Sequence, residues 1–275
     1  MRKTFQELDL KDAFLFSAAL QDEETCRLIL EIILDEPIRK VSVHAENTLL
    51  FSSDFRSLRL DIYASDEMWV EYNLEMQNEN RHNLAKRSRF HQAQMDITSL
   101  KPGEDFQALR PSYVVFICTF DPFGQGLYRY TFENRCIERG FPLDDGTKKI
   151  FLNTRGTNSG EVPGLLADFL HYVENTTDTF VQSIPDSREI QFIHQKILDL
   201  KESREWERRY MTFEELMRES MEKGIEEGLE KGLKEGQNRI LTLTSCMIQA
   251  GETASIPLLQ QDPAFLEEML VKYHL

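Results

Sequence analysis

Helical and β-type patterns alternate through the first part of the chain. Apolar residues recur at helical spacing from residue 9 to residue 36, where Pro37 ends the pattern, and again from residue 83 to residue 100. Two later stretches show the same periodicity. We therefore predict helices at residues 9–36, 83–100, 163–173 and 188–207.

Shorter runs between these helices are typical of β-strands. The run after Pro111, SYVVFICTF, is apolar throughout and predicts a buried central strand. The other predicted strands are residues 41–45, 58–64, 69–77, 127–132 and 148–152. Strands and helices that mix in this way favour an α/β or α+β protein with one central sheet.

The tail from Met211 onward follows a different pattern. Glycine stands at every fourth position from 224 to 236, and isoleucine or leucine follows each of the first three glycines. Each glycine costs a helix roughly 0.5–1 kcal/mol relative to alanine, so the segment is a weak helix on its own. Two interpretations stay open: a glycine stripe that lets a second helix approach closely, or a solvated spacer.

These patterns divide the chain into three parts. We predict an α/β domain at residues 1–210, a glycine-repeat helical segment at 211–238 and a small helical region at 239–275 that ends in a helix at 263–273. A second copy of the chain, bound through the glycine-repeat helix, is a candidate partner.

The candidate chemistry lies in residues 58–80, LRLDIYASDEMWVEYNLEMQNEN. Side chains alternate across a strand, so Arg59 and Asp61 share one face of the first predicted strand. By the same alternation, Glu75 and Gln77 share one face of the second strand. The two strands therefore each present a carboxylate on a polar face.

The register of a hairpin decides whether these carboxylates meet. Asp61 lies opposite Glu75 only when residue 65 pairs with residue 71 around a five-residue loop. A two-residue turn at 66–67 would instead place Asp61 opposite Tyr72.

Two carboxylates on one face form a hard oxygen site suited to Mg²⁺ or Mn²⁺. Such an ion polarises a phosphoryl oxygen and activates a water molecule. The amide of Gln77 would orient that water, but it does not supply the positive charge of a lysine. The alternative is an ordinary hairpin with solvated acids on its exposed face.

The composition sets a condition on any nucleic-acid function. The 275 residues include 32 lysines and arginines and 47 acids, a net charge of −15, so DNA and anionic membranes are repelled at long range. A local basic surface must overcome this repulsion. Residues 80–95 contain four lysines or arginines, two histidines and no acid, and are the candidate surface.

The helix predicted at 83–100 has two distinct faces. One is predicted to face the core and consists of Phe90, Ala93, Ile97 and Leu100. The other lies about 100° away and would meet phosphates, unless it is simply a solvated charged face. The candidate DNA contacts are Arg59, Lys86, Arg87, Arg89, His91 and Gln94, with Arg87 and Arg89 on the phosphates of the scissile strand.

Several segments, in this order, resemble the bacterial recombination-promoting nuclease/transposase family of the PD-(D/E)XK nuclease superfamily. They are LRLDIYA, NLEMQ, KRSRFHQAQMD, KPGEDFQALRPSYVVFIC, FLNTRG and the glycine-repeat tail, and the resemblance covers most of residues 1–240. It implies a restriction-endonuclease-like αβββαβ core with a mixed central sheet and a helical tail. It also implies a Mg²⁺-dependent DNA endonuclease linked to recombination or transposase-like DNA transfer.

The resemblance also implies roles for individual residues. By position, Asp61 and Glu75 become metal ligands, and the carbonyl of Met76 becomes a third. Gln77 stands where the superfamily has a lysine, a departure that bears on the rate of turnover. Glu31 matches an acid that some relatives add to the metal site, with an ordinary acid at a helix edge as the alternative.

Other features of the sequence narrow the class of protein. No stretch reaches the roughly 18 apolar residues of a membrane span, and acids precede any apolar run at the N-terminus, unlike in a secretory signal. The four cysteines form no CxxC pair that would suggest a zinc ribbon. We expect a cytoplasmic, metal-dependent DNA endonuclease. The alternative is a poorly active or inactive nuclease-fold protein that binds DNA or assembles oligomers.

Overall fold

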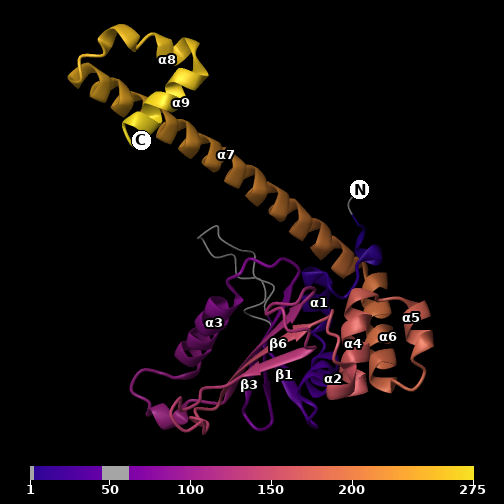
Figure 1. The fold of residues 1–275 in the computed structure, drawn as a ribbon. Coiled ribbons are helices and arrows are strands. Elements are labelled where there is room, and N and C mark those ends of the chain that lie inside the picture. The colour runs from indigo at the N-terminus through magenta and orange to yellow at the C-terminus, as the bar shows by residue number, and fades with distance from the viewer. Residues whose placement is uncertain (1–2, 45–61) are drawn as a thin grey trace. The chain divides into compact units, whose positions relative to one another are not determined.

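The computed structural model describes residues 3–44 and 62–275 of the chain. The chain divides into two compact units, Met1–Thr212 and Phe213–Leu275 (Figure 1). This boundary lies close to the predicted end of the α/β domain at residue 210. The further division of the tail into two parts stays a prediction.

The first unit contains one six-stranded sheet and the helices that cover it. Its elements in chain order are η1 (Phe5–Glu7), α1 (Ala13–Ala19), α2 (Glu23–Leu34), β1 (Val41–Val43), β2 (Ile62–Asp66), β3 (Glu71–Gln77), α3 (Leu84–Ser99), η3 (Phe106–Ala108), β4 (Ser112–Cys118), β5 (Arg129–Phe132), β6 (Thr147–Asn153), η4 (Ser159–Glu161), α4 (Gly164–Glu174), α5 (Asp178–Ser183), α6 (Arg188–Glu202) and the start of α7 (Arg204–Gln249).

The sheet is mixed and has the strand order β1-β2-β3-β4-β6-β5. Strands β1, β2 and β3 are antiparallel neighbours, whereas β3, β4 and β6 run parallel to one another. β5 closes the sheet antiparallel to β6. The apolar run after Pro111 forms β4 in the interior of the sheet, so the predicted central strand is confirmed.

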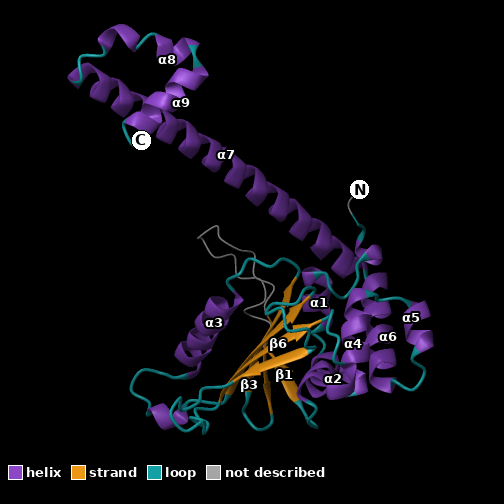
Figure 2. Cartoon of the chain, viewed as in Figure 1, coloured by secondary structure: helices purple, strands orange, loops and turns teal. Residues whose placement is uncertain are grey.

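The elements from α2 to β4 follow one another in the order αβββαβ, which confirms the core that the resemblance implied. Helix α3 covers one side of the sheet, and α1, α2 and α4 lie on the other side (Figure 2). β3 separates the two sides chemically, because Leu74 and Met76 alternate along it with Asn73 and Glu75.

The helix predicted at residues 9–36 is two helices in the structure. α1 ends at Ala19 and α2 begins at Glu23. Asp22 is the reason for the break, because its side chain accepts the backbone N–H of Thr25 at 2.9 Å and so caps a new helix. The stretch predicted as one helix at 188–207 is likewise interrupted, at Ser203 between α6 and α7.

The second unit is entirely helical among its described elements. It contains the greater part of α7, then η5 (Thr253–Ser255), α8 (Leu258–Gln261) and α9 (Pro263–Lys272). A small apolar core holds the end of the unit together and consists of Leu243, Met247, Leu259, Met269 and Leu270. The glycine repeat lies inside α7 and does not interrupt the helix. No helix in the described ranges carries an apolar stretch long enough to cross a membrane.

Candidate active site

The site is built where α3 packs over the parallel pair β3 and β4. Glu75 stands beside Phe116 of β4 in the β3–β4 register, and Gln77 stands beside Cys118. These side chains point to the same side of the sheet, because alternate residues of a strand share a face. The side chain of Glu75 is only 9% exposed, so this acid is not a solvated one on a hairpin surface.

Glu75 is contacted by two residues one helical turn apart on α3. The guanidinium of Arg87 donates to Oε1 of Glu75, and Nε2 of His91 lies 3.3 Å from Oε2. A buried carboxylate is stable only when it is paired and hydrogen-bonded. α3 therefore supplies a positively charged partner for this buried carboxylate.

Gln77 joins the same cluster. Its Nε2 donates to Oε1 of Glu75 at 2.6 Å and to the carbonyl of Met76 at 2.9 Å. Its Oε1 accepts a 2.9 Å hydrogen bond from Nη1 of Arg87. The guanidinium thus bridges Glu75 and Gln77, and it lies 5.7 Å from the centre of the Phe116 ring.

The polar layer under α3 continues beyond Glu75. Asn73 is fully buried, and neither its amide nitrogen nor its amide oxygen has a hydrogen-bond partner among the described residues. Gln92 of α3 donates to Ser112 of β4, while its own oxygen is buried and accepts no hydrogen bond from the described part of the chain. We did not predict a role for Asn73 or Gln92. The signal for Asn73 was its place two residues before Glu75 on the polar face of β3.

The thiol next to this cluster is inert. Burial first, and then the carboxylate of Glu75, raise the pKa of Cys118 to about 12. The thiol therefore stays protonated at neutral pH and is not a nucleophile.

The hairpin meets the register condition in its described part. Ser65 pairs with Glu71 and Ile62 pairs with Leu74, as the pairing of residue 61 with residue 75 requires. Asp61 and Arg59 lie outside the described residues, so their places in the site stay predictions.

Glu31 is held in a different part of the fold. It lies on α2, on the side of the sheet away from α3 (Figure 2). Oε1 accepts the backbone N–H of Ile38 at 2.8 Å, and Oε2 lies 2.7 Å from Arg27. The structure does not bring Glu31 to Glu75, and these contacts give it a structural task at the end of α2.

The predicted faces of α3 require a correction. Phe90 and Ile97, predicted to face the core, are 51% and 78% exposed. The buried residues are instead Leu84, Ser88, His91, Gln92 and Met95. The prediction was wrong because the sheet beneath α3 is partly polar, so the buried face of the helix is not its most apolar face.

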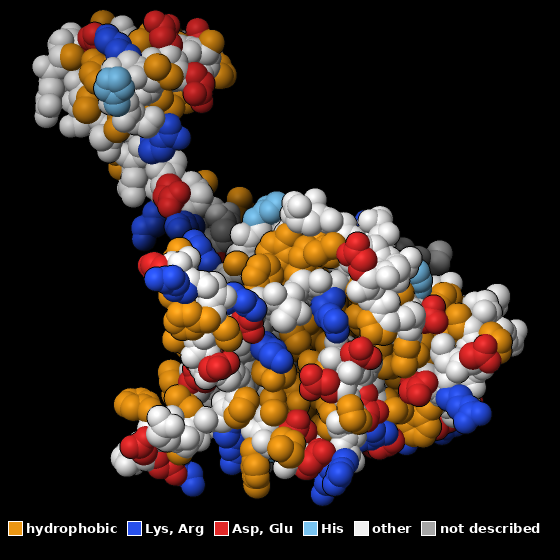
Figure 3. Space-filling view, turned by 60° about the horizontal axis from the view of Figure 1, so that its bottom comes forward, with side chains coloured by type: hydrophobic (Ala, Val, Ile, Leu, Met, Phe, Trp, Pro, Cys, Tyr) orange, Lys and Arg blue, Asp and Glu red, His pale blue; other side chains and the backbone are white. Residues whose placement is uncertain are grey.

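The remaining candidate DNA contacts lie around the same helix. Lys86 and Arg89 are exposed, and Gln94 is half-buried. On the molecular face drawn in Figure 3, basic and acidic side chains are interspersed and hydrophobic side chains reach the surface between them. Charges of one sign therefore do not dominate this face.

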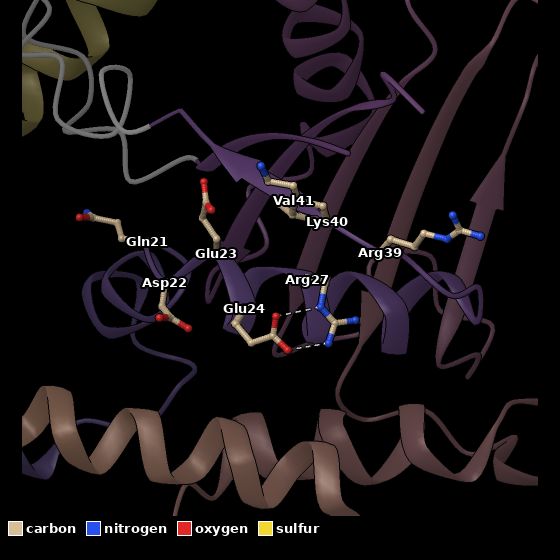
Figure 4. A pocket seen from close by; sticks show the side chains of 8 residues that line it. All are labelled: Gln21, Asp22, Glu23, Glu24, Arg27, Arg39, Lys40 and Val41. Atoms are coloured by element: carbon tan, nitrogen blue, oxygen red, sulfur yellow. Dashed lines mark hydrogen bonds and ion pairs between the residues drawn. The ribbon is translucent and has the colours of Figure 1, made fainter. Parts of the chain in front are cut away.

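A cavity of about 440 Å³ lies at the start of α2, away from this cluster. Figure 4 shows its lining, which is made of Gln21, Asp22, Glu23, Glu24, Arg27, Arg39, Lys40 and Val41. Some of its charged lining residues form ion pairs. Arg27 pairs with Glu24 at 2.7 Å, and Asp22 pairs with Lys196 at 3.2 Å. We assign no chemistry to this cavity.

A mixed sheet in αβββαβ order, with a buried carboxylate on its third strand, defines the class of restriction-endonuclease-like nuclease folds. The chain belongs to the family described as PD-(D/E)XK nuclease family transposase, whose model matches residues 13–218. No curated protein and no solved structure matches the chain. Membership assigns it a nuclease- or transposase-like function in general terms, with DNA as the kind of substrate.

Nucleases of this superfamily typically use divalent metal ions, and the described residues fit such an ion in part. Oε2 of Glu75 is buried and accepts no hydrogen bond from the described residues, so this carboxylate has unused ligand capacity. The carbonyl of Met76 shares the Nε2 donor of Gln77 with Oε1 of the same carboxylate. Within residues 3–44 and 62–275, however, no three or more His, Cys, Asp or Glu side chains are grouped to hold a metal.

Proposed function

We propose that this protein is a metal-dependent DNA endonuclease that hydrolyses phosphodiester bonds. The observation that carries the proposal is the buried carboxylate of Glu75, which shares one polar face of β3 with Gln77 and is contacted by a basic helix. Asp61, Glu75 and the Met76 carbonyl would hold Mg²⁺ or Mn²⁺. When bound, such an ion polarises the phosphoryl oxygen and activates water.

The other residues bind and orient the substrate. Gln77 orients the attacking water through its amide, which donates and accepts hydrogen bonds. Arg87 and Arg89 bind the phosphates of the scissile strand, and Lys86, His91, Gln94 and Arg59 extend this surface. Water adds to phosphorus, and the bond to the 3′ oxygen breaks to release a 3′ hydroxyl. Such cleavage would serve recombination or transposase-like DNA transfer.

Plasmid nicking tests this proposal. Purified protein is incubated with supercoiled plasmid and Mg²⁺, Mn²⁺, Ca²⁺ or EDTA, beside the variants Asp61→Ala and Glu75→Gln. We expect metal-dependent nicking that falls on the order of 100-fold or more in both variants. Glu79→Ala is the matched control, because Glu79 is exposed and paired only at the surface with Arg81. Nicking that persists in both site variants would refute the assignment.

A second candidate function is that of an assembly module, and one observation favours it. Five large apolar side chains stand at every fourth position of α7 and are 44–73% exposed, namely Met217, Met221, Ile225, Leu229 and Leu233. A second copy of the chain would cover this row and use the adjacent glycines for close approach. Light scattering tests it: the full chain should exceed the mass of one copy, and Leu229→Glu should restore that mass. Lys231→Glu is the control.

A further inference from the structure

Arg87 makes contacts that a phosphate-binding arginine does not require. Its guanidinium donates to Oε1 of Glu75 with one nitrogen and to Oε1 of Gln77 with another. Planar guanidinium groups recognise pairs of oxygens in this way, and each such bond is strengthened by charge. Arg87 is therefore an integral part of the carboxylate cluster in this structure, in contrast to the exposed Lys86 and Arg89 on the same helix.

The two partners differ in their access to solvent. The side chain of Glu75 is 9% exposed, whereas that of Arg87 is 32% exposed. A buried carboxylate without a cation is strongly destabilised, so Glu75 needs a positive partner at all times. Arg87, by contrast, is able to turn its guanidinium toward solvent, because a long flexible stem carries it.

Oε1 of Glu75 and the carbonyl of Met76 share one donor, Nε2 of Gln77, so a divalent cation held by these two residues would use the same oxygen as the guanidinium. Oε1 of Glu75 already accepts hydrogen bonds from both Gln77 and Arg87. Magnesium demands near-ideal geometry at about 2.1 Å from its oxygen ligands and leaves no room there for a second cationic donor. The divalent cation and the guanidinium of Arg87 are both positively charged, so they also repel each other at this distance. The repulsion is strongest in a buried site that contains little water.

Departure of Arg87 would change the surroundings of Gln77 as well. The Oε1 atom of Gln77 accepts its hydrogen bond from Arg87, so this oxygen becomes available to a water molecule once the guanidinium has left. His91 remains next to Oε2 of Glu75 from the same helix, so the helix keeps one contact with the carboxylate.

From these contacts we propose that Arg87 is a built-in counter-ion of Glu75 and competes with the divalent metal for it. Metal binding displaces the guanidinium, which then faces the phosphate of bound DNA. Arg87 is thus a positioning residue that couples occupation of the metal site to the binding of substrate. The inference rests on the proposed function, because it takes Glu75 as a metal ligand.

The test measures Mn²⁺ affinity by titration calorimetry and thermal unfolding in EDTA, both on the full chain. Arg87→Gln should bind Mn²⁺ roughly 10- to 100-fold more tightly than the unaltered chain, and should unfold at a lower temperature in EDTA. Arg89→Gln removes the same charge from an exposed position two residues away and should change neither property. A purely structural role for Arg87 would lower both stability and metal affinity.

Each outcome decides between the proposals. If the unaltered chain binds Mn²⁺ and Arg87→Gln binds it no more tightly, the competition is refuted while the metal site stands. If neither protein binds Mn²⁺, the metal-dependent function fails and the competition fails with it. Should Arg87→Gln not fold by circular dichroism, Arg87→Lys takes its place. Its ammonium lacks the rigid planar fork with which Arg87 contacts Glu75 and Gln77 together, so Mn²⁺ affinity should still rise, and an unchanged affinity refutes the inference.

Discussion

The two sides of the sheet bury different kinds of side chain from β3. On the side of α1, α2 and α4, Leu74 and Met76 of β3 are buried among apolar side chains. On the side of α3, Asn73 and Glu75 of the same strand are buried as deeply, and polar side chains such as Arg87 join the apolar ones there. Four consecutive residues of one strand thus belong to two different environments.

This difference indicates which residues of β3 stabilise the fold and which are buried at a cost in stability. Apolar burial is the main favourable contribution to folding, and Leu74 and Met76 provide it on the first side. On the second side, polar atoms of Asn73, Glu75 and Gln92 are buried without hydrogen-bond partners among the described residues. Native proteins retain few such groups, and those that persist coincide with functional sites. Substitutions on the two sides should therefore differ in sign as well as in size.

The largest effect is expected on the apolar side. Leu74→Ala removes a fully buried side chain and leaves a cavity, so the free energy of unfolding should fall by about 2–5 kcal/mol. Urea unfolding followed by tryptophan fluorescence measures this loss, because Trp69 and Trp206 both lie in the first unit. A loss below about 1 kcal/mol would mean that this side is loosely packed and would remove the contrast.

The polar side should respond in the opposite direction. Asn73→Leu replaces an amide whose two polar atoms have no partner in residues 3–44 and 62–275, so the free energy of unfolding should stay unchanged or rise by about 1 kcal/mol. The matched control is Asn153→Leu. Asn153 is equally buried, but it donates to the carbonyl of Leu127 and accepts the N–H of Arg155, so its loss should cost about 1–3 kcal/mol. Equal losses at both asparagines would contradict the proposed contrast.

A smaller loss of stability than at Leu74 is expected at Asp22, a charged residue at the edge of the apolar side. Asp22→Ala removes the cap of α2 and should lower the free energy of unfolding by about 1 kcal/mol at neutral pH. Burial raises the pKa of Asp22, but hydrogen bonds from Thr25 and Lys196 outweigh it and hold the pKa below its ordinary value of 3.8.

The pH dependence follows from the direction of this shift. Because the pKa of Asp22 is lowered by folding, its contribution is complete above pH 3.8 and is lost as the pH falls through the lower pKa of the folded protein. The difference between Asp22→Ala and the unaltered chain should therefore vanish in strong acid. Glu23→Ala, which removes the neighbouring charge and keeps the cap, should show no comparable loss.

The strands that form the centre of the sheet were the most predictable part of the fold. β4 is apolar on both faces, and β3 alternates, so each pattern has one simple interpretation. The sequence left two registers open for the hairpin of β2 and β3, and the structure has the one in which Ser65 pairs with Glu71. The break at Asp22 was missed because the apolar periodicity continues on both sides of the cap.

The candidate site was predictable in its residues but not in its surroundings. Alternation on β3 placed Glu75 and Gln77 together, and the structure joins them by a hydrogen bond. Their burial depends on the placement of α3, a tertiary property that local periodicity does not carry. The contact between Arg87 and Glu75 joins residues twelve positions apart on different elements, and only the packed helix reveals it.

The alternation of β3 also limits how the length of this chain changes during evolution. Substitution at one position of the strand alters one environment, but insertion or deletion of a single residue exchanges the two environments for every residue beyond it. Glu75 would then enter the apolar interior and Leu74 would enter the polar cluster. Length variation is tolerable in the turn at Glu67–Val70, outside both strands, so aligned relatives should show gaps there and none between Glu71 and Gln77.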